Sequence, residues 1–240
     1  FGSINHDAMC EVKDATDKII LRSKSLKIKC PLGTELEGKI QLDSDNLKTQ
    51  EVTISRFPMV VPKPIKADGF SGKVVLNNFL TTTGSKMYEP AYLELNKPVS
   101  IKIKNGKIEN FRGNKELIQK VKNHYRMVAL NFNIERDRIH SFHAGLHPGC
   151  SYEKPKIKNP DHWSNSVFAS PNYLHFHTCG NYAPGEICWM LPNHTIFVDG
   201  IALWDRGKFK PEHFSETTAV LNRWPGLAKV YNTQYGSTDI

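Results

Sequence analysis

The sequence predicts an α+β fold, with largely antiparallel β-sheets and a few flanking helices in a single domain. Residues 99–104 alternate apolar and polar side chains and run into Asn105-Gly106, a pair that tolerates the positive φ angles of a type I′ hairpin turn. Residues 194–204 show a second hairpin pattern around Asp199-Gly200. Two other stretches space their apolar residues as helices do. Strand pairs joined by tight turns and accompanied by separate helices are typical of α+β domains.

The first elements are a helix and two short strands. From about Asp7 to Leu21 the apolar residues recur at helical spacing. Residues 26–30 alternate apolar and basic side chains, and a Pro-Leu-Gly turn signal separates them from another short strand. Residues 56–72 are rich in Pro, Gly and Lys, which predicts a long irregular connection. Strand character resumes from Lys73 to Leu80.

The second half of the chain adds a helix and the second hairpin. Asn114 is a good N-cap, and Leu117, Val121 and Tyr125 follow on one apolar stripe. The turn signal Asp205-Arg206-Gly207 closes the second hairpin system. Beyond about residue 210 the sequence shows no pattern that assigns an element.

The composition describes an ordinary globular protein with a basic surface. The 240 residues are 39% hydrophobic and 23% charged, with a formal net charge of +8. No apolar run approaches the roughly 20 residues that span a bilayer, and no signal peptide is visible, so we expect no membrane partner. The basic residues are spread along the chain without RNA-binding or zinc-finger spacing, so we expect no nucleic-acid partner. Five cysteines without a C-x-x-C pair predict reduced thiols and a cytoplasmic protein.

Chemistry-bearing residues concentrate in one part of the chain. Eight of the ten histidines lie between His140 and His213. Alternate residues of a strand share a face, so His175 and His177 would point the same way, with Cys179 continuing that face. Glu186 and Cys188 form a similar pair. Imidazole and carboxylate groups ligate zinc and iron, so two neighbouring strands here could hold one metal ion among His143, His175, His177 and Glu186. The alternative is that these histidines are core or hydrogen-bonding residues.

A loop rich in glycine follows His143. In Gly145-Leu146-His147-Pro148-Gly149, the residue before the proline is restricted to extended conformations. Such a constrained loop could present His147 to a pocket, or it could be a simple turn. The chain contains no G-x-G-x-x-G, Walker or G-x-S-x-G motif, so nucleotide-binding and serine-hydrolase functions have no support.

The order of several passages resembles a known superfamily. They are Ser23-Lys24 to Gly33-Thr34, Gly69 to Lys107 with its Glu89-Pro90 and Asn105-Gly106, Gly145-Leu146-His147-Pro148, and Asn193 to Gly200. Together they resemble the C-terminal domain of the thermophilic-type leucyl aminopeptidases and the related iron-dependent dihydroxypyridine dioxygenases, over roughly residues 20 to 208 of this sequence. The resemblance implies a truncated member of this superfamily that lacks the separate N-terminal domain of the aminopeptidases. It also implies a homodimer.

The resemblance also implies altered metal ligands. The first ligand position of the family falls near Ser141, with His140 and His143 beside it, and the next lies in the stretch from His175 to Gly180. The His-x-Asp pair of the family falls at Glu186 and Cys188, where a thiolate would be a softer ligand than a carboxylate. Either the ligands are rearranged, with the three histidines taking over, or the site holds no metal.

Two functions follow from these features. The first is a metal-dependent enzyme, of the non-haem iron oxygenase or metallohydrolase type, acting on a small molecule or a peptide. It would use Fe(II) or Zn, with His147 or Tyr182 as the acid–base partner. The second is a non-catalytic homologue that has lost its metal and binds a peptide, for example a precursor peptide in peptide natural-product biosynthesis. The basic surface would favour an acidic peptide.

Overall fold

The computed structural model describes residues 4–40, 60–82, 88–152, 158–180 and 184–232. Within these ranges, twelve strands form one antiparallel sheet with five α-helices around it. The strands are β1 Leu26–Lys29, β2 Glu35–Gly38, β3 Ile65–Lys66, β4 Phe70–Thr81, β5 Tyr92–Lys104, β6 Lys107–Arg112, β7 Ile139–Ala144, β8 Tyr173–Cys179, β9 Glu186–Pro192, β10 Thr195–Val198, β11 Ile201–Asp205 and β12 Lys208–Phe209. The helices are α1 His6–Leu21, α2 Lys115–Phe132, α3 Pro160–Ser166, α4 Ser215–Arg223 and α5 Pro225–Asn232, with a short 3₁₀ turn η3 at Pro211–His213. The predicted α+β fold is confirmed.

The sheet branches at β4. Its hydrogen-bonded order runs β12-β11-β10-β1-β2-β4-β9-β8-β7-β3, while β5 pairs with β4 and β6. Residues 70–73 of β4 pair with β2, and residues 80–81 pair with β9. A register shift between Leu76 and Asn78 lies between these two pairings, and the φ of Asn78 is 82°. The bulge bends the strand, so one strand joins both parts of the sheet.

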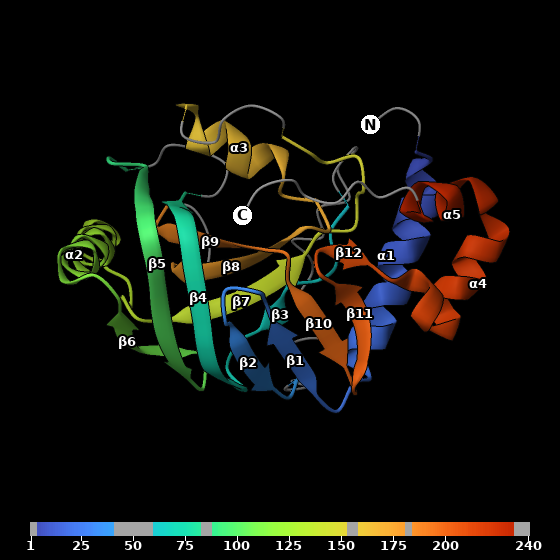
Figure 1. The fold of residues 1–240 in the computed structure, drawn as a ribbon, viewed down its shortest axis with the longest axis horizontal. Coiled ribbons are helices and arrows are strands. Elements are labelled where there is room, and N and C mark those ends of the chain that lie inside the picture. Colours follow the sequence, from blue (N-terminus) through green and yellow to red (C-terminus); the bar gives the residue numbers. More distant parts are fainter. Residues whose placement is uncertain (1–3, 41–59, 83–87, 153–157, 181–183, 233–240) are drawn as a thin grey trace.

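The helices lie at three places around the sheet (Figure 1). Helix α2 lies at the end formed by β5 and β6, whereas α1, α4 and α5 group at the opposite end. Helix α3 covers β8 and β9. It also contacts the end of β4, where the Thr81 and Ser164 hydroxyl oxygens lie 3.1 Å apart. No helix in the described part of the chain is long and apolar enough to cross a membrane.

The locally encoded elements form as the sequence predicts. The hairpin turn at Asn105 and Gly106 has φ angles of 47° and 70°, and the turn at Asp199 and Gly200 has 49° and 88°. Both pairs of values fit a type I′ turn. The Asn114 side chain caps α2 by accepting the Leu117 N–H at 3.1 Å.

Two parts of the chain differ from the sequence prediction. The described part of the segment 56–72 is not wholly irregular, because it contains β3 and the start of β4. The described part of the tail, residues 211–232, forms η3, α4 and α5, and α4 packs on α1 through an ion pair between Arg223 and Glu11. The Tyr231 hydroxyl then donates to the Leu146 carbonyl at 3.0 Å. Helices as short as α4 and α5 depend on packing against other elements such as α1. The sequence of the tail alone therefore does not predict these two helices.

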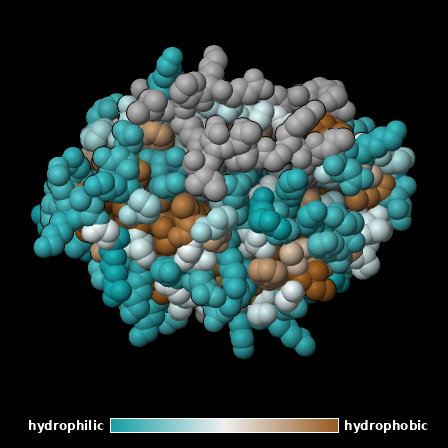
Figure 2. All heavy atoms as spheres, viewed as in Figure 1, coloured by the Kyte–Doolittle hydropathy of each residue, from teal (hydrophilic) through white to brown (hydrophobic). Residues whose placement is uncertain are grey.

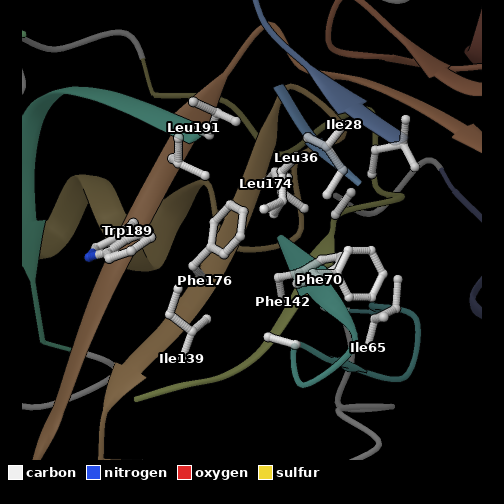
Figure 3. Packing of buried hydrophobic residues seen from close by; sticks show 14 of the residues in the cluster. Ile28, Leu36, Ile65, Phe70, Ile139, Phe142, Leu174, Phe176, Trp189 and Leu191 are labelled. Carbon is white, nitrogen blue, oxygen red and sulfur yellow. The ribbon is translucent and has the colours of Figure 1, made fainter. Parts of the chain in front are cut away.

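A row of aromatic rings crosses the middle of the core (Figure 3). Phe70 and Phe142 lie 4.9 Å apart between ring centroids, Phe142 and Phe176 lie 5.3 Å apart, and Phe176 and Trp189 lie 5.4 Å apart. These four side chains come from β4, β7, β8 and β9 and are fully buried. Ile28 and Leu36 extend the same cluster towards β1 and β2. On the face viewed in Figure 2, hydrophilic residues surround smaller apolar patches.

A buried hydrogen-bond chain ties α2 to this core. The Trp189 indole N–H donates to the Tyr125 hydroxyl at 2.6 Å, and the Tyr125 and Thr178 hydroxyl oxygens lie 2.7 Å apart. Thr178 in turn donates to the Ile187 carbonyl at 2.8 Å. Each of the linked side-chain groups of Trp189, Tyr125 and Thr178 therefore has a hydrogen-bond partner. Buried polar groups stabilise a fold under this condition.

Replacing Tyr125 by Phe tests this chain. The Y125F variant leaves the buried Trp189 N–H without its acceptor, so we expect the free energy of unfolding to fall by about 1–3 kcal/mol. Urea unfolding of the wild type and the variant measures the change. The matched control is Y92F, because Tyr92 is 41% exposed. Equal stability of Y125F and Y92F would contradict the role assigned to Tyr125.

Candidate functional site

Strands β7, β8 and β9 carry a group of side chains that we call the histidine cluster: His143, His175, His177, Glu186 and Cys188. Strand β8 pairs with β7 so that His143 lies opposite His175. It pairs with β9 so that His177 lies opposite Cys188. Because Phe142, Phe176 and Trp189 face the core, strand alternation turns these residues to the other face of the sheet. The two strands that carry His175, His177, Glu186 and Cys188 are hydrogen-bonded neighbours.

The three imidazole rings of the cluster lie against one another. His143 stacks on His175 with ring centroids 5.3 Å apart and planes 2° from parallel. It also stacks on His177 at 5.2 Å with an angle of 28°. The ring of Phe168 meets both His143 and His175 edge-on at 4.9 Å. The cluster is therefore a packed stack with an aromatic wall.

In each of the three rings, one nitrogen has no hydrogen-bond partner among the described residues. His177 Nδ1 bonds to Glu186 Oε1, and His175 Nδ1 lies 3.8 Å from Cys188 Sγ. Three buried nitrogens have no hydrogen-bond partner among the described residues, namely His143 Nδ1, His175 Nε2 and His177 Nε2. An unpaired buried polar atom typically costs about 1–3 kcal/mol, so three in one place need an explanation.

Burial keeps two of the rings neutral. His143 and His175 are 2% and 0% exposed. Burial, with a smaller effect from the neighbouring His177 and His175, holds the pKa of His143 well below its ordinary value. Burial, followed by the charge of His177, lowers the pKa of His175 to about 3. A neutral imidazole has a lone pair available, which is the form that binds metal ions.

The rings are stacked and do not converge. Within the described ranges, no three His, Cys, Asp or Glu side chains are arranged to hold an ion as they stand. The donor types nevertheless fit a divalent metal, because imidazole nitrogens with a nearby carboxylate suit zinc and iron. Three ring nitrogens without a hydrogen-bond partner among the described residues lie in the same cluster, but one ion would reach all three only if the rings turned out of their stack.

The two predicted acid–base residues are not part of the histidine cluster that the structure describes. The His147 ring is turned onto its own loop, where its Nδ1 accepts the Gly149 N–H at 3.1 Å. Tyr182 lies outside the described residues. Cys179 does not continue the histidine face as predicted, because its φ of 64° ends the alternation and it packs in the main core cluster. His140 Nε2 lies 2.7 Å from the Cys179 carbonyl oxygen.

Two residues of the neighbourhood were not predicted from the sequence. Phe168 lies between α3 and β8, and no periodicity in that stretch indicates that its ring reaches the histidines. His194 is fully buried, and a charge on it would lower the pKa of His175. The position of His194 just after β9 is the signal that could have placed it, since Pro192 pairs with Tyr173 at the same end of β8.

Another buried histidine, His124, lies near the backbone of Glu186. Tyr88 donates its hydroxyl to the Glu186 carbonyl at 2.7 Å, and its ring contacts His124 at 5.8 Å. Burial lowers the pKa of His124 to about 4. Its Nε2 has no hydrogen-bond partner among the described residues. His124 is therefore held neutral between α2 and the strand that carries Glu186.

Neither a protein-family model nor a curated protein sequence matches the chain. Among solved structures, the fold is similar to that of the 2,5-dihydroxypyridine dioxygenase from Pseudomonas putida KT2440, with a TM-score of 0.62 and 14% sequence identity. The similarity covers 88% of this chain and 61% of the dioxygenase chain. The chain thus spans about three-fifths of the length of that enzyme.

The structural similarity tests one part of the resemblance found in the sequence. At 14% identity it shows a shared fold. It supports the dioxygenase side of the resemblance, whereas the link to the leucyl aminopeptidases and the truncation stay predictions.

Acid titration tests the buried state of His124. Since its pKa is lowered from about 6.5 in the unfolded chain to about 4 in the fold, the unfolded chain binds an extra proton in this range. The contribution of the neutral, buried His124 to the free energy of unfolding is therefore complete above pH 6.5. It is lost as the pH falls towards 4, and the loss is at most about 3 kcal/mol. We expect H124F to show a shallower loss of stability than the wild type.

Urea unfolding of the wild type and of H124F at pH 7 and at pH 4.5 measures how much the free energy of unfolding of each protein falls between the two pH values. The variant H213F is the control, because His213 lies on the surface and should leave the slope unchanged. A pH dependence of H124F identical to that of the wild type would show that His124 titrates normally in the folded protein.

Proposed function

We propose that this chain is a metal-dependent enzyme whose divalent ion binds at the histidine cluster. The observation that supports this most strongly is the side-by-side placement of three buried ring nitrogens without partners. They come from two strands whose other faces build the core. A metal ion would replace three unsatisfied lone pairs by three bonds, which explains why the fold keeps them together.

The metal we propose is iron(II) or zinc. The neutral rings of His143 and His175 supply nitrogen donors, and His177 adds a third. Imidazole suits both ions, and the similarity of the fold to a dioxygenase favours iron. When bound, the ion would supply Lewis-acid chemistry, either towards a substrate oxygen or towards dioxygen or water.

The side chains around the ion would hold a proton, admit the substrate and exclude water. Glu186 is 3% exposed and bonded to His177, so its carboxylate is placed to hold a proton at Oε1 next to the ion. His177 is the most exposed of the three histidines at 9%, so substrate would approach from its side. Phe168 lies over His143 and His175 and would exclude water from them. His147 and Tyr182 are proposed as further acid–base residues.

The reaction class we favour is non-haem iron oxygenation, with metal-dependent hydrolysis as the second possibility within the same site. The substrate would be a small molecule or a peptide, and the active protein would be a homodimer in the cytoplasm. A metal-free homologue that binds an acidic peptide is the alternative function. The metal content of the protein distinguishes the enzyme from this alternative.

Metal analysis of protein purified without chelator tests the proposal. We expect about one iron or zinc ion per chain, and a rise in the thermal midpoint when the metal-free protein is given Fe(II) or Zn(II), because an ion that binds only the folded state stabilises it. The H175A variant should lose both the ion and the rise. The H213A variant, which removes an exposed histidine, should keep them.

Two results would contradict the proposal. One is protein without metal in every preparation and without stabilisation by either ion. The other is metal that H175A retains as fully as the wild type, since the ion would then lie elsewhere. Saturable, salt-sensitive binding of an acidic peptide to the metal-free protein would in that case favour the alternative function.

A further inference from the structure

We propose that Phe168 is a gate over the histidine cluster, and that a close backbone contact between Ala169 and Gly145 holds this gate closed. The inference goes beyond the proposed function, because it concerns access to the rings of His143 and His175 and holds whether or not an ion binds there. Any ligand that reaches these two rings from the side of Phe168 has to displace its side chain first.

The ring of Phe168 lies between two buried imidazoles and the surface. It meets His143 and His175 edge-on, with ring centroids 4.9 Å away in each case. The two imidazoles are 2% and 0% exposed, whereas Phe168 itself is only partly buried. Phe168 is therefore the outer of the two layers, and its side chain shields the rings from solvent.

A tight turn presents Phe168 to the cluster. Helix α3 ends at Ser166, and the Ser170 N–H donates to the Val167 carbonyl at 2.9 Å, which closes a four-residue turn. Phe168 is the second residue of this turn and belongs to no helix or strand. The position of its ring therefore depends on where the turn lies and not on the register of a strand.

The turn lies directly against the end of β7 because Gly145 has no side chain. A Cβ atom at Gly145 would overlap the carbonyl group of Ala169 and would lie 2.5 Å from the backbone nitrogen of Ser170. Across the same contact, the His147 N–H donates to the Ala169 carbonyl at 2.7 Å. Glycine is the residue that permits two backbones to approach so closely. We call this contact the seam.

Two aromatic donors hold the β7 side of the seam in place. The Trp204 indole N–H donates to the Gly145 carbonyl at 3.0 Å, and the Tyr231 hydroxyl donates to the Leu146 carbonyl at 3.0 Å. Trp204 lies on β11 and Tyr231 on α5, and both side chains are buried. Because this side is fixed, opening of the gate moves the turn and breaks the hydrogen bond across the seam.

Modification with diethyl pyrocarbonate tests the gate, because this reagent acylates neutral imidazole rings that it can reach. The reaction is run on chelator-treated protein at pH 7, and the modified residues are mapped by mass spectrometry. In the wild type, we expect His143 and His175 to react far more slowly than the exposed His213. His124 is 4% exposed and lies on α2, so its reaction reports loosening of the whole fold.

Two substitutions open the gate in different ways. F168A removes the ring, and G145A pushes the turn off the seam. In both variants the reaction at His143 and His175 should become at least about 10-fold faster while His124 stays protected, because the opening is local. Circular dichroism checks that each variant is folded.

Each substitution has a matched control. Y152A removes an aromatic ring that contacts His162 of α3, at 5.6 Å between ring centroids. G226A adds a Cβ atom that would have nothing within 4 Å. Both variants should react as the wild type does.

Three results would overturn the inference. One is reaction at His143 and His175 in folded F168A that is as slow as in the wild type. Another is a wild type in which both rings react as fast as His213. The third is an equal rise at His124 in F168A, since the whole fold would then be loosened. The proposed metal function stands apart from these results, because the metal content of the protein tests it separately.

Discussion

The packing of Phe142, Phe176 and Trp189 against one another determines which way three strands face. Each ring is fully buried, and burial of a large apolar side chain contributes about 1.5–3 kcal/mol. Because successive residues of a strand point to opposite faces, this packing also turns His143, His175 and Cys188 away from the core. A slip of one residue in any of these strands would put a histidine into the core and an aromatic ring into the site.

The same constraint explains why the site is buried and polar at once. Strands β8 and β9 are buried on both faces, one by the main core and the other by α3 and Phe168. On the core face, the polar groups of Tyr125, Thr178 and Trp189 satisfy one another. On the histidine face, three ring nitrogens remain without partners among the described residues. This contrast between two faces of the same strands is the observation on which the proposed binding site rests.

The sequence predicts the features that local chemistry determines. The Asn105-Gly106 and Asp199-Gly200 turns and the cap at Asn114 form as expected, because φ preferences and side-chain caps act within a few residues. The shared face of His175 and His177 follows from the period of a strand. Sequence alone could not show that β7 pairs beside β8 or that Phe168 reaches the rings, since both depend on packing between distant segments. The left-handed φ at Cys179 and the helices α4 and α5 depend on tertiary contacts in the same way.

The similarity to a dioxygenase shows a shared fold, and the proposal rests on the chemistry of the side chains in the histidine cluster. Crystals of the protein grown with Fe(II) or Zn(II) would connect them. An anomalous-difference map recorded at the absorption edge of the metal gives the position of the ion directly. We expect one peak, within bonding distance of nitrogens of His143, His175 and His177. A map without a peak at these residues, from protein that is folded and saturated with the ion, would contradict the central claim.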